Sequence, residues 1–133
     1  MKIAYILRGI PGSGKSTLAK ILAGESGKIH FVDSYFYVDG EYRFDGTKLA
    51  EYHMRSLVAF CNSLGEGGYP AVICDNVNSK LEHCRPYIEA ARKAGYLVAI
   101  VMLPHPRPEI AVARSTHGVP LATIERLLAE WEY

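Results

Sequence analysis

The chain has 133 residues, of which 49% are hydrophobic and 22% are charged. This length suits one domain, so we expect residues 1–133 to form a single domain, and the ordinary composition excludes a disordered or fibrous chain. Fifteen Lys and Arg against fourteen Asp and Glu leave a formal net charge of +1. Such a balance excludes a strongly basic, histone-like mode of nucleic-acid binding but allows a local basic patch.

The apolar runs are short and the cysteines are not paired in spacing. The longest run, residues 96–103, is far shorter than a membrane span, and residues 3–7 are too short for the apolar part of a secretory leader. Cys61, Cys74 and Cys84 do not form the even, paired pattern of a disulfide framework or a zinc site. We therefore expect a reduced, cytoplasmic chain with no membrane partner.

Apolar runs and helical patterns alternate along the chain. Strands are expected at four places, residues 3–7, 29–32, 71–74 and 96–103. Helices are expected at five places, residues 16–23, 45–64, 80–94, 109–115 and 120–132. Asp45 offers a cap for the second helix and Asn78-Ser79 for the third. Continuous apolar strands interleaved with helices predict an α/β fold, with a short parallel sheet of about four strands between two helical layers and a small helical lid.

A glycine-rich loop follows the first predicted strand. Residues 9–16 read Gly-Ile-Pro-Gly-Ser-Gly-Lys-Ser, which matches the P-loop pattern between a strand and a helix. Its glycines let backbone N–H groups surround an anion at the positive end of the new helix. Lys15 is placed to reach the β- and γ-phosphates, and the Ser16 hydroxyl to bind Mg²⁺. We expect eight residues to bind ATP: Gly9, Pro11, Gly12, Ser13, Gly14, Lys15, Ser16 and Thr17.

Two aspartates fall at the predicted ends of strands, where ligands bind in sheets of this kind. Asp33 closes the second strand and Asp75 the third. Asp33 is the candidate general base for an acceptor hydroxyl, and Asp75 the candidate carboxylate on the metal side. Each could instead cap the turn or helix that follows it.

Aromatic side chains and arginines mark two further segments. Residues 35–44 contain five aromatic rings, which could stack on a nucleobase or cover the next helix. After the fourth strand, Arg107 and Arg114 lie where a mobile lid would carry an arginine to the transferred phosphoryl group, and Arg114 is the stronger candidate. His117 could contact a phosphate, although a histidine in a turn beside glycine is more often structural.

The order of these motifs resembles that of P-loop kinase domains of the polynucleotide 5′-hydroxyl kinase type, both the phage repair enzyme and related eukaryotic AAA-annotated domains. The matching segments are Leu7–Thr17, Asp33–Phe36, Tyr42–Asp45, Cys74–Asn78 and His117–Pro120. The resemblance implies a P-loop NTPase fold. It also implies contacts from Lys15 and Ser16 to phosphate and Mg²⁺, Asp33 as the general base and Arg114 as a lid arginine.

Two departures from the family pattern concern the acceptor. Phe36 stands where the phage enzyme has an arginine on the acceptor phosphate, and Ser34 stands where a second aspartate is found. A ring at position 36 could stack on the terminal base, or it could be a core residue.

The sequence thus predicts an ATP- and Mg²⁺-dependent kinase whose acceptor is the 5′-hydroxyl of a polynucleotide. Two alternatives remain open at this point. One is a kinase for another hydroxyl, on a nucleoside, a small metabolite or a hydroxymethyl base in phage DNA. The other is a nucleotide-binding module without acceptor chemistry, which Asp33 argues against because such a module needs no base opposite the γ-phosphate.

Overall fold

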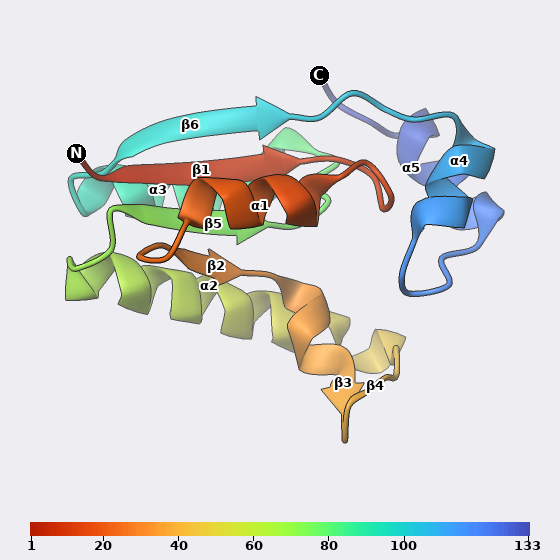
Figure 1. The fold of residues 1–133 in the computed structure, drawn as a ribbon, viewed down its shortest axis with the longest axis horizontal. Helices are drawn as coiled ribbons and strands as arrows, with labels where there is room; N and C mark the ends of the chain where they lie inside the picture. Colours follow the sequence, from red (N-terminus) through yellow and green to blue (C-terminus); the bar gives the residue numbers. More distant parts are fainter.

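A four-stranded parallel sheet forms the centre of the computed structural model, which describes residues 1–133. Its strands lie in the order β2-β5-β1-β6, as Figure 1 shows. Their bounds are Ile3–Arg8 for β1, Lys28–His30 for β2, Ala71–Asp75 for β5 and Leu97–Met102 for β6. In the register of the sheet, Ile6 of β1 lies between Cys74 of β5 and Ile100 of β6. The predicted parallel sheet is confirmed, and its two central strands, β5 and β1, correspond to the predicted apolar runs 71–74 and 3–7.

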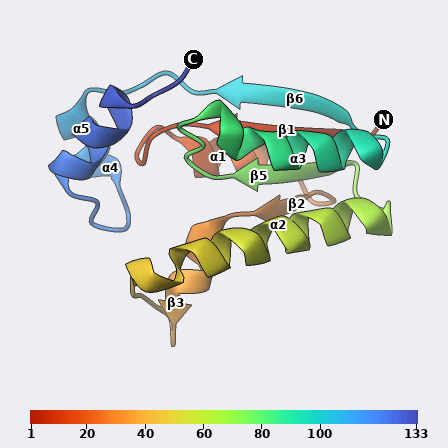
Figure 2. The ribbon, with the colours of Figure 1, turned by 180° about the vertical axis from the view of Figure 1, so that it is seen from behind.

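Helices cover both faces of this sheet. Helix α1 (Lys15–Ala23) lies on one face, and α2 (Leu49–Glu66) and α3 (Leu81–Lys93) lie on the other (Figures 1 and 2). Successive side chains of β1 point alternately to the two faces of the sheet, as in any strand. Ala4 and Ile6 belong to the core under α2 and α3, whereas Leu7 belongs to the core under α1. This is the predicted three-layer α/β/α arrangement, the fold of P-loop NTPase kinases.

The remaining elements gather beyond the carboxyl ends of the strands (Figure 1). They are two 3₁₀ helices, η1 (Val32–Phe36) and η2 (Gly46–Lys48), the hairpin β3–β4 (Tyr37–Val38 and Glu41–Tyr42), and helices α4 (Pro108–Arg114) and α5 (Leu121–Ala129). Ile10 of the glycine-rich loop, Ala111 of α4 and Ile124 of α5 share one buried cluster. The two last helices are thus packed against the loop that follows β1. No helix combines the length and apolar composition that crossing a membrane requires.

The second strand ends earlier than predicted. It stops at His30, and the chain then turns into η1, so that Asp33 lies in a 3₁₀ helix and not at the last position of a strand. The reason is a side chain: the backbone N–H of Val32 donates to Oδ1 of Asn76 at 3.0 Å. The side-chain amide of Asn76, in the loop after β5, therefore accepts the hydrogen bond that a backbone carbonyl of a neighbouring strand would otherwise accept. The hairpin β3–β4 was not predicted.

The predicted cap of the third helix is wrong. Helix α3 begins after Lys80, whose N–H donates to Nδ1 of His83 at 3.3 Å. Asn78 has a φ of 50°, a left-handed conformation that asparagine tolerates, and its amide donates to the carbonyl of Leu7 at 2.7 Å. The asparagine therefore fastens the loop after β5 to the end of β1. Asp45 accepts from the N–H of Thr47 at 3.0 Å and caps η2, the 3₁₀ helix that leads into α2, whereas the N-cap of α2 itself is Lys48.

Phe36 is a core residue, so its predicted stacking on an acceptor base is wrong. The side chain is only 2% exposed, and its ring packs against those of Tyr42, Phe44 and Tyr52. Tyr42 and Phe44 come from the segment around β4, and Tyr52 comes from α2. Phe36 therefore holds η1 and the hairpin onto α2.

We expect Phe36→Ala to lower the free energy of unfolding by about 3 kcal/mol, the usual cost of removing a buried phenyl ring. Urea denaturation of the purified variant measures this loss. Phe44→Ala is the matched control, because Phe44 is 60% exposed and its removal leaves a smaller void. Equal stability of the wild type and Phe36→Ala would contradict the core position.

His30 makes the stability of the fold depend on pH. Its ring is buried at the end of β2, where Nε2 lies 2.8 Å from the hydroxyl of Ser63. Burial, with a smaller contribution from the charge of Lys28, lowers the pKa of His30 from 6.5 to about 4. Between these two values the unfolded chain binds more protons than the native protein, so the free energy of unfolding rises with pH. The contribution is complete above the unfolded pKa and disappears as pH falls through the folded one.

We therefore expect the wild type to become less stable as the pH falls from 7 to 4, because this group takes up a proton on unfolding. Urea denaturation at several pH values measures the loss. His30→Gln should have a shallower pH dependence than the wild type. Equal slopes for His30→Gln and the wild type would show that the proton is taken up elsewhere.

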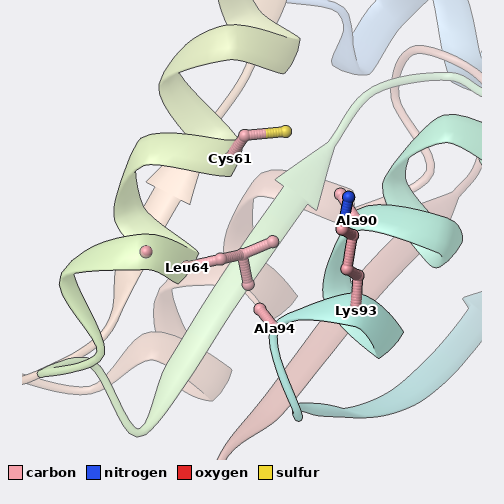
Figure 3. A pocket seen from close by; sticks show the side chains of 6 residues that line it. Cys61, Leu64, Ala90, Lys93 and Ala94 are labelled. Carbon is pink, nitrogen blue, oxygen red and sulfur yellow. The ribbon is translucent and has the colours of Figure 1, made fainter.

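A cavity of about 240 Å³ lies between α2 and α3 (Figure 3). Cys61 and Leu64 line it from α2, and Ala90 and Lys93 line it from α3. These residues belong to the C-terminal halves of helices that run antiparallel to the strands. The cavity is therefore at the opposite end of the sheet from the glycine-rich loop.

Candidate active site

The glycine-rich loop joins β1 to α1 and needs glycine at two positions with positive φ. Gly12 has a φ of 84° and Gly14, which precedes the first residue of α1, has a φ of 95°. A Cβ on Gly12 would also overlap the backbone carbonyl of Ala111 in α4. The loop is thus in close contact with the first lid helix. A loop of this kind at the amino end of a helix has backbone N–H groups of the type that bind anions.

Lys15, Ser16 and Asp75 meet at the start of α1. The Ser16 hydroxyl donates to Oδ2 of Asp75 at 3.0 Å. Burial lowers the pKa of Lys15, and the charges of Asp75 and then Asp33 oppose this shift. Burial likewise raises the pKa of Asp75, opposed by Lys15 and by the hydrogen bond from Ser16. One lysine and two carboxylates therefore interact electrostatically at the end of the strands.

The oxygen atoms of Ser16 and Asp75 fit a Mg²⁺ ion. Magnesium prefers oxygen ligands and keeps several waters, so it uses one or two protein ligands together with substrate phosphates. No group of three or more His, Cys, Asp or Glu side chains that could hold a metal ion occurs in the structure. Ser16 and Asp75 are the residues that would hold such an ion.

Asp33 faces both the hairpin and the lid. Its Oδ1 accepts a hydrogen bond from the Tyr42 hydroxyl at 3.2 Å, and its Oδ2 lies 3.7 Å from Nε2 of His117. Burial, followed by the interactions with Asp33, raises the pKa of Tyr42, so the phenol stays protonated and remains a donor. The Asp33 side chain is still 47% exposed. It is a fixed carboxylate that solutes can reach.

Asn76 positions the segment that carries Asp33, and the sequence analysis assigned it no role. Its Oδ1 accepts from the N–H of Val32, and its Nδ2 lies 3.5 Å from the hydroxyl of Tyr87 in α3. The amide is buried and linked on both sides, which fixes the backbone one residue before Asp33. The signal in the sequence was a run of short polar residues directly after a buried strand, which turn chemistry explains equally well.

Arg114 ends helix α4, which the Gly12–Ala111 contact sets against the glycine-rich loop. Arg114 lies three residues after Ala111, about one helical turn further along α4. Its side chain is exposed and has no hydrogen-bond partner in the protein. Arg107 precedes the same helix and is exposed as well. The structure thus places Arg114 on the lid, one helical turn beyond the contact with the loop.

Arg8 is a second residue that sequence reasoning left without a role. It is only 3% exposed, and its guanidinium donates to the carbonyls of Asn78 at 2.8 Å and Ser79 at 3.1 Å. It also donates to the carbonyl of Glu132 and lies over the ring of Trp131. This arginine ties β1, the loop after β5 and the end of the chain together behind the glycine-rich loop. A charged residue at the end of an apolar strand was the available signal.

A glycine-rich anion loop at the carboxyl end of β1 and a doubly covered parallel sheet define a P-loop NTPase with the fold of the kinases in this class. The sequence profile of one such family, described as AAA domain, matches residues 5–132. The chain belongs to this AAA domain family.

The chain is also similar to a larger human protein, and its fold is similar to those of solved structures. Human NEDD4-binding protein 2 is 34% identical over 142 aligned residues, which cover 98% of this chain and 8% of that protein. The chain therefore spans only a small part of this relative. The structure of the Pnkp1/Rnl/Hen1 RNA repair complex superposes with a TM-score of 0.71 at 18% identity, covering 97% of this chain and 43% of the other. Kti12 of Chaetomium thermophilum, in complex with ADP-AlF3, superposes with a TM-score of 0.67 at 13% identity, covering 98% and 80%.

Proposed function

We propose that this protein is a kinase that transfers the γ-phosphoryl group of ATP to the 5′-hydroxyl of a polynucleotide. The observation that carries the proposal is the position of Asp33, a reachable carboxylate that interacts electrostatically with the P-loop residue Lys15. A domain that only bound nucleotide would need the lysine but no carboxylate opposite it. We also propose that residues 1–133 act as one kinase domain in the cytoplasm.

In the proposed reaction each residue has a separate task. The glycine-rich loop and Lys15 bind the β- and γ-phosphates. Ser16 and Asp75 would hold Mg²⁺, which would supply positive charge against the phosphates. Asp33 accepts the proton of the acceptor hydroxyl as its oxygen attacks the γ-phosphorus. The bond from that phosphorus to the β,γ-bridging oxygen breaks, and ADP leaves. Arg114 stabilises the charge that develops on the transferred group.

Exposed rings in the segment that follows Asp33 support a nucleic-acid end as the acceptor. Phe44 is 60% exposed and Tyr37 is 46% exposed, although both belong to the segment that packs around the buried Phe36. Stacking of a base on an aromatic ring contributes about 1–3 kcal/mol and tolerates any base. The net charge of the chain is close to zero, so we expect it to contact few phosphate groups. Binding of the oligonucleotide should then depend more on stacking than on charge. The likeness to a structure from an RNA repair complex supports the same acceptor class.

One screen tests the proposal directly. The purified protein is incubated with γ-labelled ATP and Mg²⁺ and with 5′-hydroxyl DNA, 5′-hydroxyl RNA, nucleosides or hydroxymethylated DNA. We expect label on the 5′-hydroxyl oligonucleotides, with weak base preference, and none on oligonucleotides that already carry a 5′-phosphate. Label on a nucleoside or on hydroxymethylated DNA alone would support the kinase activity but show that the acceptor is not a polynucleotide 5′-hydroxyl. Tight ATP binding without transfer to any hydroxyl would favour a nucleotide-binding module.

A further inference from the structure

Strand β6 is an open edge of the sheet. It pairs with β1 on one side, and no other strand lies beyond it on the other side (Figure 1). The N–H of Leu103, directly after β6, donates to the carbonyl of Arg8 in β1. Backbone groups alternate in direction along a strand, so those of Val98, Ile100 and Met102 face away from β1. These three residues therefore present N–H and C=O groups that the sheet does not use.

The two edges of the sheet differ in length and in charge. At the other edge, β2 has only three residues and begins with Lys28. A short edge strand that carries a lysine is a common protection against pairing between sheets. Strand β6 has six residues and no charged side chain, and its Leu97 and Ile100 are 57% and 51% exposed. The β6 edge therefore lacks the protection that β2 has.

An apolar groove of about 330 Å³ runs between β6 and α3. Ile100 lines the groove from the strand, and Leu81 and Ile88 line it from the helix. Leu81 is 47% exposed, so the apolar lining is open to solvent. Exposed apolar surface thus continues from the edge of the sheet onto α3.

Charged side chains along α3 alternate in sign. They lie three or four residues apart and therefore on one face of the helix: Glu82, Arg85, Glu89 and Arg92. All four are exposed, and none forms an ion pair within the chain. Against a second, antiparallel α3, Glu82 would meet the other copy's Arg92, and Arg85 would meet the other copy's Glu89. Both pairs are centred on Tyr87, so one placement of the two helices satisfies them together.

The dimensions of a sheet suit the same placement. Helix α3 packs under both β1 and β6. Antiparallel pairing of β6 with the β6 of a second copy, at the usual strand spacing of about 4.8 Å, would set the two α3 helices roughly 10 Å apart. Packed helices lie about 8–10 Å apart. The free backbone groups, the groove and the charges therefore all fit a second copy of the chain.

We propose that β6 and α3 form a two-fold interface with a second copy of this chain, in which the two sheets join into one. Each copy uses the same surface, so the contact closes at a dimer. The protected β2 edges stay on the outside of the joined sheet, which prevents further growth. This inference does not depend on the proposed kinase activity.

Sedimentation equilibrium of the purified protein tests the interface. We expect the wild type to form dimers, and Ile100→Lys to raise their dissociation constant at least about 100-fold, because two like charges then meet near the two-fold axis. Val58→Lys is the matched control, since Val58 of α2 is also 51% exposed, and it should leave the constant unchanged. A wild type that stays monomeric up to its solubility limit would overturn the proposal and leave the β6 edge to an extended segment of another protein. Assemblies that grow beyond the dimer would overturn it as well.

Exchange of charges tests the placement of the helices. Arg85→Glu and Glu89→Arg should each weaken the dimer roughly tenfold, because each turns two attractive pairs into repulsive ones. A mixture of the two variants should associate as the wild type does, since every glutamate then faces an arginine of the other chain. Thermal melting reports whether each variant is folded. Dimers that both folded variants leave intact, or a mixture that fails to associate, would refute the antiparallel pairing of α3.

Discussion

Replacing Lys15 by alanine should lower phosphoryl transfer about 10²–10³-fold, the size of effect seen when one donor to the developing charge is removed. The ammonium group is the only positive charge that the P-loop motif itself supplies, and Asp75 and Asp33 act to keep it protonated despite its burial. Without it, the two carboxylates would face the phosphates unopposed. Single-turnover transfer from labelled ATP measures the loss.

Lys20→Ala is the matched control for this experiment. Lys20 lies on the same helix, is exposed, and should give wild-type rates when it is replaced. The Lys15→Ala protein should stay folded and show a cooperative thermal unfolding transition, because the core contacts of Ala19 in the same helix are unchanged. Wild-type turnover by folded Lys15→Ala would show that the glycine-rich loop does not bind the reacting phosphates.

The sheet and the phosphate loop were predictable from the sequence because their signals are local. Strands β1 and β5 are apolar runs that end in Arg8 and Asp75, and their residues are buried or half-buried throughout. The loop at Gly12 and Gly14 has a pattern that few other structures require, and both glycines have the positive φ that explains their presence. Capping by Asp45 also depends only on neighbouring residues.

The elements around the acceptor could not be predicted in the same way, because long-range contacts determine them. The strand before Asp33 ends at His30 because of Asn76, a residue 44 positions from Val32 in the chain. Phe36 looks like an exposed loop ring until α2 and the hairpin close over it. His117 lies 84 residues after Asp33 (117 minus 33), so no spacing in the sequence could show that the lid meets the base. Proximity of this kind exists only in the folded chain.

Asp33→Asn is the substitution that separates chemistry from structure at this site. An asparagine Oδ1 can still accept the hydrogen bond that Tyr42 donates to Asp33, so the hairpin should keep its place. What is lost is the ability to take up a proton from the attacking hydroxyl. We expect ATP affinity to stay within a few-fold by calorimetry and single-turnover transfer to fall by about 10²–10⁴, the usual contribution of a general base.

The control for this variant is Asp39→Asn, at the exposed tip of the hairpin. Asp39 has a φ of 50°, a conformation that asparagine adopts as readily. The Asp39→Asn variant should therefore transfer phosphate at the wild-type rate. Loss of ATP binding in Asp33→Asn, with unchanged transfer per bound complex, would assign Asp33 to the nucleotide and not to the acceptor. A fall in transfer at constant ATP affinity would instead place the proton on Asp33, because the substitution changes charge and basicity while leaving the size of the side chain and its hydrogen bond to Tyr42 in place.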